Sequence, residues 1–135
     1  MRDPKAEGDR WFEQATADLQ AARSMRKEGH WWAACFHAQQ AGEKAVKAYL
    51  YGEGERLVLG HAVAQLIRDA AQHNARFLEL AEAAASLDVY YIGTRYPNGI
   101  PGGVPAEVFV ESQARSAIEH AELVLEFVRR MRCNA

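Results

Sequence analysis

Residues 36–50 read Phe36-His37-Ala38-Gln39-Gln40-Ala41-Gly42-Glu43-Lys44-Ala45-Val46-Lys47-Ala48-Tyr49-Leu50. Alanine, the strongest helix former, recurs through this segment, so a helix is predicted from about His30 to Tyr51. At about 100° per residue, small and apolar side chains cover one half of this helix, and the polar ones share an arc of roughly 120°. The polar side chains of the arc are His37, Gln40, Glu43, Lys44 and Lys47, with Phe36 and Ala33 between them. A helix with so narrow a polar side is expected to be packed on most of its surface.

Two interpretations of this polar arc remain open. Glu43 and Lys47 lie four residues apart, so they can form an ion pair that supports an ordinary solvated helix surface. Alternatively, the presence of Phe36 among the polar residues indicates a surface that something else covers. That surface would be a dimer contact or an anionic ligand site that uses Lys44 and Lys47.

The remainder of the chain is also helical in pattern. The first helix is predicted to begin at Asp3-Pro4, where aspartate can cap it, and to end at Gly29. Further helices are expected at about 62–72, 74–91 and 106–131, whereas residues 93–105 contain three prolines and four glycines and are predicted to be a loop. No segment has the alternation of a strand. The sequence therefore predicts an all-α fold, an antiparallel up-and-down bundle of four to five helices, in a single domain over residues 1–135.

Composition restricts the classes of function. The chain has 135 residues, 49% of them hydrophobic, and a formal net charge of -2, which excludes a large uniform basic surface. No apolar run approaches the roughly 18 residues of a membrane span. The segment from Met1 to Glu7 has no apolar signal region, so a cytoplasmic protein without membrane contact is expected. No cluster of Cys, His, Asp or Glu has metal-ligand spacing, so neither a metal nor a cofactor is expected.

A second group of candidate residues lies where the helical pattern stops. Arg95 stands among Tyr90, Tyr91 and Tyr96, beside the loop rich in glycine and proline. Arg95 could bind a phosphate while Tyr91 or Tyr96 stacks on a base. The alternative is structural: the tyrosines complete the core and Arg95 anchors the loop by hydrogen bonds to carbonyl oxygens.

Taken together, these segments resemble the HEPN domain family, the higher-eukaryote and prokaryote nucleotide-binding domain. Residues 36–50 are similar to its second-helix pattern Gln-Ala-x-Glu-Lys-x-x-Lys-Ala-x-Leu. Residues 15–19 resemble the family's first helix, and Gly60-His61 resembles the entry to its third. Residues 90–97 resemble the Tyr…Arg-Tyr-Pro segment of one large branch. The likeness covers almost the whole chain in the same order.

The resemblance implies an all-helical homodimer that often works beside a minimal nucleotidyltransferase, in pairs that resemble toxin–antitoxin systems. On this basis the expected function is a dimeric binding protein that contacts a nucleotide or RNA phosphate. The expected contact residues are Arg95, Lys44, Lys47, His37, Gln40, Tyr91 and Tyr96. The alternative is a metal-independent ribonuclease toxin, because active members of the family resemble enzymes that join two Arg-x4-6-His motifs across a dimer.

Several Arg–His pairs have about this spacing, but geometry disfavours most of them. They are Arg23 with His30, Arg56 with His61, Arg68 with His73, and Arg115 with His120. Arg115 and His120 are the candidate catalytic pair because they come late in the chain. In one continuous helix, however, positions i and i+5 point about 140° apart, and Glu119 offers Arg115 a closer partner. The sequence thus leaves open whether the protein is an enzyme.

Overall fold

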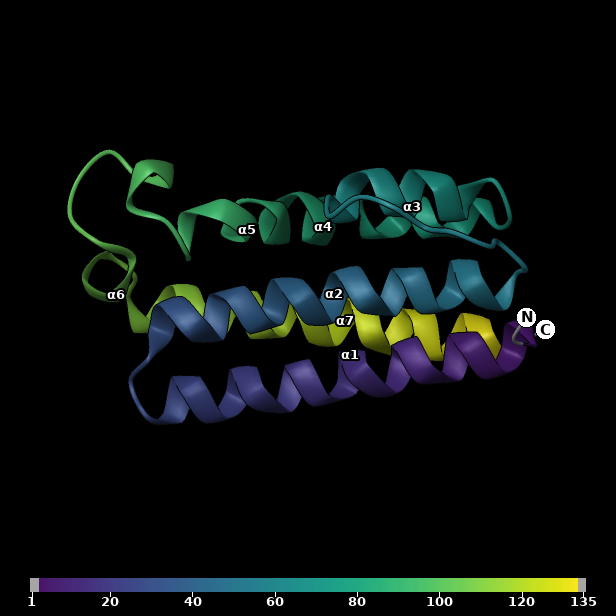
Figure 1. The fold of residues 1–135 in the computed structure, drawn as a ribbon, viewed down its shortest axis with the longest axis horizontal. Helices are drawn as coiled ribbons and strands as arrows, with labels where there is room; N and C mark the ends of the chain where they lie inside the picture. The colour runs from purple at the N-terminus through teal and green to yellow at the C-terminus, as the bar shows by residue number, and fades with distance from the viewer. Residues whose placement is uncertain (1–2, 134–135) are drawn as a thin grey trace.

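A computed structural model of the chain describes residues 3–133 and is an all-α bundle, which confirms the predicted fold class. Three long helices and a fourth row of short ones run alternately up and down (Figure 1). The long helices are α1 (Pro4–Lys27), α2 (Trp31–Gly52) and α7 (Glu111–Cys133). The shorter elements are α3 (Val63–Ala71), the 3-10 turn η1 (Ala75–Leu80), α4 (Ala81–Asp88), α5 (Tyr90–Gly93), the 3-10 turn η2 (Pro97–Gly99) and α6 (Pro105–Val108). Residues 1–2 and 134–135, the ends of the single domain predicted over 1–135, lie outside the described residues, and that domain assignment stays a prediction.

The helices α1 and α2 form a closely packed antiparallel hairpin. The side chain of Asp3 accepts a hydrogen bond from the backbone N–H of Ala6 and caps α1, as predicted. The turn to α2 uses Gly29 at φ +84°, a conformation that favours glycine. Near the other end of the hairpin, a Cβ added to Gly8 would lie 2.8 Å from the backbone oxygen of Ala48. The two helices therefore approach to backbone contact at Gly8.

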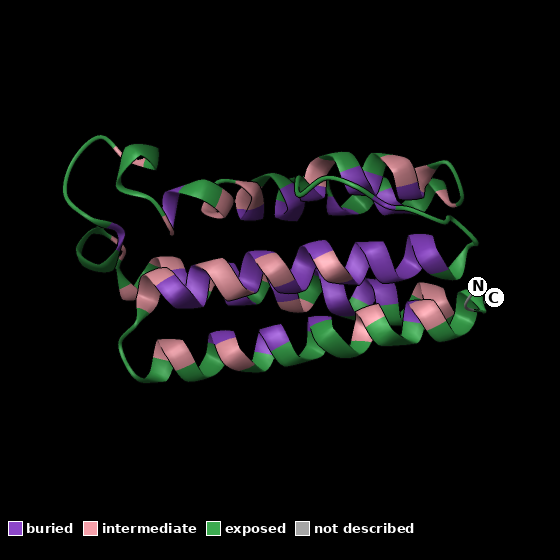
Figure 2. Cartoon of the chain, in the orientation of Figure 1, coloured by how far each residue is buried: buried purple, intermediate pink, exposed green. Residues whose placement is uncertain are grey.

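The centre of the bundle is α2, which packs against α1, α7 and the row of short helices. Most of α2 is buried along its whole length (Figure 2). Alanines on α2 that are fully buried allow the neighbouring helices to come close, because a methyl group takes little space. Cys35 belongs to this core, and burial raises the pKa of its thiol to about 12. Cys133 is exposed.

The helix predicted over 74–91 is interrupted. Asn74 caps its start as expected, by accepting from the backbone N–H of Arg76, but the first turns are the 3-10 element η1, and α4 and α5 follow separately. The last predicted helix also begins as the short α6 and breaks at Phe109 and Val110. Phe109 is extended, and its ring packs edge-on against Tyr90 with 6.0 Å between the centroids. Packing between distant segments thus overrides a continuous helical pattern.

The start of α3 is capped from a distant part of the chain. Both carboxylate oxygens of Asp88, at the end of α4, accept backbone hydrogen bonds, from Val63 at 2.6 Å and from Ala64 at 3.0 Å. These N–H groups have no partner inside α3, because they belong to its first turn. The cap fixes the entry to α3, and with it the position of His61 just before the helix.

Residues 3–133 contain neither a helix that could span a membrane nor a group of side chains that could hold a metal ion. No helix in this part of the chain is long and apolar enough to cross a membrane. Within the same residues, no group of three or more His, Cys, Asp or Glu side chains is placed to hold a metal ion.

Candidate functional site

The polar arc of α2 lies between two neighbouring parts of the bundle. We call its residues His37, Gln40, Glu43, Lys44 and Lys47 the α2 polar face. On one side these residues contact Asp18 of α1, and on the other they contact His61, just before α3. The α2 polar face therefore takes part in two separate clusters, one centred on a carboxylate of α1 and the other on a carboxylate of α2.

The first cluster is centred on Asp18. Its carboxylate is almost fully buried and binds Nδ1 of His37 at 3.1 Å and Nζ of Lys44 at 2.7 Å. Gln14 also donates to it, at 3.4 Å. Burial alone would raise the pKa of Asp18, but the hydrogen bonds from His37 and Lys44 outweigh it and hold the pKa below its ordinary value. Asp18 is thus a buried anion that Lys44 neutralises and that His37 also contacts.

The second cluster is centred on Glu43. One of its oxygens lies 3.1 Å from Nζ of Lys47 and 3.1 Å from Nδ1 of His61. The other accepts from the side-chain amides of Gln39, at 3.3 Å, and Gln40, at 3.4 Å. Gln39 also donates to the backbone oxygen of His61 at 3.0 Å, which ties the segment before α3 to α2.

The Glu43–Lys47 pair exists, but it does not lie on a solvated surface. The side chains of Glu43 and Lys47 are only 4% and 6% exposed. The interpretation of this pair as ordinary helix-surface support is wrong, because α1 and the segment before α3 cover this part of α2. A buried pair differs from a surface pair because both charges have lost their hydration. Removing one partner therefore leaves the other as an unpaired buried charge, which is strongly destabilising.

Arg95 is held among aromatic rings at one end of this region. Its guanidinium carbon lies 4.3 Å from the ring centroid of Tyr91, 5.0 Å from that of Tyr96 and 5.1 Å from that of Phe36. Its Nε donates to the backbone oxygen of Tyr91 at 2.8 Å, so one part of the structural interpretation holds. No carboxylate among residues 3–133 forms an ion pair with it. Arg95 therefore carries a charge that the described part of the chain does not neutralise.

The aromatic rings that hold Arg95 also contact the two clusters. The ring of Tyr91 stacks on His61, with 4.6 Å between the centroids and 15° between the planes. The ring of Phe36 meets His37 edge-on, with 5.6 Å between the centroids. Arg95 is thus one aromatic ring away from each histidine. The residues expected to bind a phosphate thus fall into three contact groups: Arg95 with Tyr91 and Tyr96, His37 with Lys44 at Asp18, and Gln40 with Lys47 at Glu43.

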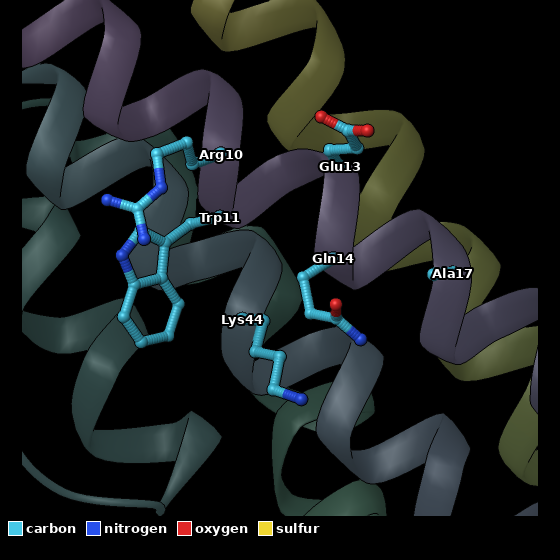
Figure 3. Close-up of a pocket in the computed structure, with 6 residues that line it drawn as sticks. All are labelled: Arg10, Trp11, Glu13, Gln14, Ala17 and Lys44. Atoms are coloured by element: carbon cyan, nitrogen blue, oxygen red, sulfur yellow. The ribbon is translucent and has the colours of Figure 1, made fainter.

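A hollow of about 510 Å³ continues this side of the molecule between α1 and α2. It is lined by Arg10, Trp11, Glu13, Gln14, Ala17 and Lys44. Figure 3 shows Gln14 on α1 and Lys44 on α2 extending in roughly the same direction, and both side chains donate to Asp18. Trp11 stacks on Tyr51 at 5.2 Å and forms the other part of the wall. Lys44 therefore lies between the Asp18 cluster and this hollow.

The candidate catalytic pair lies elsewhere, on α7. Arg115 is 54% exposed and approaches Glu111, one turn earlier, at 3.7 Å. The partner expected from the sequence, Glu119, is not the one observed. His120 is half-buried in the same unbroken helix, so its side chain diverges from that of Arg115 by about 140°. A single chain does not bring Arg115 and His120 together.

Sequence reasoning missed Asp18 and His61 as members of the site. Asp18 falls in the apolar stripe of α1, three residues after Ala15 and seven after Trp11, and a carboxylate in such a stripe indicates a buried polar partner. The sequence indicates His61 only as a residue at a helix start. Its proximity to Glu43 depends on how the segment before α3 folds back, which no local pattern shows.

Comparison with known proteins agrees with this architecture. A curated protein of Methanocaldococcus jannaschii named "Putative toxin MJ1304" is 28% identical over 128 residues, which cover 88% of this chain and 84% of that protein. The crystal structure of TT1696 from Thermus thermophilus is 35% identical, covers 92% of this chain and 97% of its own, and superposes with a TM-score of 0.87. The structure of ST0689, described as an archaeal HEPN homologue, is 31% identical, covers 93% and 98%, and has a TM-score of 0.78. The family model for the HEPN domain matches residues 9–131, and the chain therefore belongs to the HEPN domain family.

Proposed function

We propose that the protein binds the phosphate of a nucleotide or of RNA on the side of α2 that carries Arg95. One observation carries this proposal: Arg95 is a fixed cation with no carboxylate partner among the described residues, held by Tyr91, Tyr96 and Phe36. A guanidinium fixed in this way loses little conformational entropy when it binds a phosphate, and its planar donors match phosphate oxygens.

The tyrosines supply the second part of the proposed contact. Tyr96 is 50% exposed and Tyr91 is half-buried, so each has ring surface beside the guanidinium. A base could stack on Tyr96 while its phosphate contacts Arg95, because stacking on an aromatic ring tolerates every base.

The residues of the α2 polar face differ in whether they could contact the ligand directly. His37, Gln40 and Lys44 are half-buried and could reach a bound ligand. Lys47 is almost fully buried against Glu43, so it would act by holding Glu43 in place. Since Asp18 and Glu43 offset the two lysines, Arg95 supplies the net positive charge of the site.

Membership of the family supports two further parts of the proposal. The protein would act as a homodimer in the cytoplasm, and it would work with a minimal nucleotidyltransferase as its partner.

A toxin role is the second candidate, and the similarity to the protein named "Putative toxin MJ1304" favours it. In this version the protein is a metal-independent ribonuclease that pairs Arg115 of one subunit with His120 of the other. Expression of the wild-type chain should then arrest growth, and Arg115→Ala or His120→Ala should relieve the arrest. Unchanged toxicity in both variants would exclude that pair.

Binding is tested by calorimetric titration with 5′-AMP and with a short single-stranded oligoribonucleotide. We expect Arg95→Ala to weaken binding at least tenfold and Arg95→Lys to recover part of it. Arg76→Ala is the matched control, because Arg76 also lies over a ring, that of Phe127, but is paired with Glu79. Flat titrations of the wild type with both ligands, or equal affinity in Arg95→Ala, would refute the proposal.

A further inference from the structure

We propose that the outward side of η1, α4 and α5 is the surface on which a second copy of this chain docks, in an antiparallel two-fold contact. Five residues, which we call the outer stripe, form this surface: Leu78, Ala81, Ala85, Val89 and Ile92. The position of the contact rests on the outer stripe alone. A consequence for RNA binding at Arg95 rests in addition on the proposed function.

The row of short helices is apolar on two opposite sides. Its inward side belongs to the core and consists of buried residues: Phe77, Leu80, Ala84 and Leu87. Its outward side carries the outer stripe, in which Leu78, Val89 and Ile92 are 53%, 67% and 47% exposed. In Figure 1, α4 and α5 lie at the edge of the bundle farthest from α1, so no long helix among residues 3–133 covers this side. A helical segment that is apolar on both sides is expected to be covered on both.

The residues of the outer stripe share one narrow face. At about 100° per residue, the four later residues of the stripe fall within an arc of about 80°, and Leu78 continues the line into η1. Between residues 80 and 92 the charged side chains are Glu82, beside the stripe, and Asp88, which is turned toward α3 and caps it. The centres of protein–protein contacts are depleted in charged residues in the same way. The outer stripe therefore fits another apolar protein surface.

The spacing of the outer stripe identifies the partner as a second copy. Successive stripe residues are three, four, four and three positions apart, so the pattern reads the same in both directions about Ala85. A two-fold contact requires a surface that is complementary to itself. In the antiparallel arrangement, Leu78 meets Ile92 of the partner subunit. Ala81 meets Val89 of the partner subunit, and the two Ala85 residues meet on the axis. Val89 then faces a small residue, whereas parallel packing would set it against a second Val89.

The size of the outer stripe fits a weak but specific dimer. Half-exposed side chains of this size contribute on the order of 100 Å² each, so the two stripes and the residues beside them would bury about 1,000 Å² in total. That area is at the lower limit for specific protein–protein contacts. We therefore expect a dimer that dissociates at micromolar concentrations.

The antiparallel contact would place both Arg95 sites on one side of the dimer. Arg95 contacts Phe36 of α2 and Tyr91, so it lies on the flank of α5 that faces α2. A two-fold axis that runs across both helices keeps like flanks together. In this register Arg95 of one copy lies level with Ala75 of the other, so about 30 Å separates the two sites along the contact. Tyr96 lies outside the stripe, and its half-exposed ring stays available to a base. One RNA strand could therefore contact both sites.

The contact is tested by sedimentation equilibrium across a range of protein concentrations. We expect the wild type to dimerise, and Val89→Glu to weaken the association at least tenfold, because the new charge would be buried against Ala81 of the partner subunit. Leu123→Glu is the matched control, because Leu123 on α7 is 52% exposed and lies outside the stripe. This control should leave the dimer intact. Circular dichroism checks that both variants fold.

A cross-link locates the two-fold axis. Ala85→Cys, in a chain that also carries Cys133→Ser, should form a disulfide between two copies on mild oxidation, because residues on the axis come within the distance that a disulfide spans. Leu123→Cys in the same background should not cross-link. The remaining cysteine, Cys35, does not interfere because it is buried.

The shared side is tested by titration with a twelve-nucleotide single-stranded RNA and with 5′-AMP. Twelve stacked nucleotides, at about 3.4 Å each, span more than the distance between the two sites. We expect the wild type to bind this RNA at least tenfold more tightly than 5′-AMP, because the second contact is intramolecular once the first has formed. Val89→Glu should lose that advantage and bind 5′-AMP as the wild type does.

The outcomes separate this inference from the proposed function. A wild type that stays monomeric, or a dimer that survives in Val89→Glu or fails to cross-link through Ala85→Cys, overturns the contact. A dimer that depends on Val89, without any gain for the longer RNA, overturns the bridging and leaves the contact standing. Failure of the wild type to bind either ligand overturns the proposed function and the bridging, while the contact is decided by sedimentation and cross-linking.

Discussion

Two pairs of charged residues have the same spacing and opposite surroundings. Glu43 and Lys47 on α2 lie four residues apart, as do Glu111 and Arg115 on α7. The α2 pair is 3.1 Å long and almost fully buried, whereas the α7 pair is 3.7 Å long and about half exposed. Spacing along a helix therefore predicts that two side chains can form an ion pair. How much the pair contributes to stability depends on whether neighbouring helices bury it.

The largest expected effect comes from breaking the buried pair. Lys47→Met keeps most of the side-chain volume and removes the charge, which leaves Glu43 buried with His61 as its remaining ionisable partner. We expect the free energy of unfolding to fall by about 3 kcal/mol, because an unpaired buried charge is costly. Urea denaturation measures it. A loss below about 1 kcal/mol would mean that water reaches Glu43 and that the pair resembles the one on α7.

The next effect concerns the helix that covers the α2 polar face. In Gly8→Ala the new methyl group meets the backbone oxygen of Ala48 at 2.8 Å, and backbone cannot move aside as a side chain can. We expect a net loss of about 1–2 kcal/mol, since overpacking exceeds the roughly 1 kcal/mol gained in helix propensity. Gly52→Ala is the control, because its new methyl meets nothing within 4 Å. Thermal unfolding of both variants compares them, and equal melting temperatures would contradict the close contact.

The third effect depends on pH. The pKa of Asp18 is lower in the folded chain than its ordinary value of 3.8, so ionised Asp18 stabilises the fold above that pH. This contribution is lost as pH falls from about 4 through the folded pKa. Asp18→Asn should therefore be less stable than the wild type at pH 7, and the difference should shrink as the pH falls below about 4. Urea midpoints across this range test it, and a difference independent of pH would assign the effect to packing.

The smallest effect is expected on α7. Arg115→Ala removes an exposed ion pair and should change the free energy of unfolding by less than about 0.5 kcal/mol. The same denaturation measurement applies. If Arg115→Ala lowered the free energy of unfolding as much as Lys47→Met, the two ion pairs would not differ in their contribution to stability.

Much of the fold could be predicted from the sequence, because its signals are local. The cap at Asp3, the stop at Gly29 and the alanine pattern of α2 each act within a few residues, and they are enough to locate α1 and α2. The interruptions of the predicted helices near α4 and α6 could not be predicted from local signals. Phe109 leaves the helical conformation to pack on Tyr90, a residue far away in the chain.

The candidate site was predictable to a similar extent. The helical wheel of α2 placed His37, Gln40, Glu43, Lys44 and Lys47 in one arc, because residues on one helix keep a fixed angular relation. The helical wheel could not predict the residues of neighbouring elements that contact this arc, which are Asp18 on one side and His61 on the other. It also gave no measure of burial, so it could not distinguish a solvated pair from an enclosed one.

The cap that Asp88 gives to α3 has a consequence for the order of folding. Asp3 caps α1 from the adjacent residue, so that helix is complete as soon as its first turn forms. The first turn of α3 must wait until α4, 25 residues further along, has docked. Because contacts close in sequence form sooner than distant ones, we expect the α1–α2 hairpin to assemble early and the entry to α3 late. His61 takes its place only when that entry is fixed, so a partly folded chain would hold the Asp18 half of the site and lack the other half. Ligand binding that needs both halves would then begin only when folding is complete.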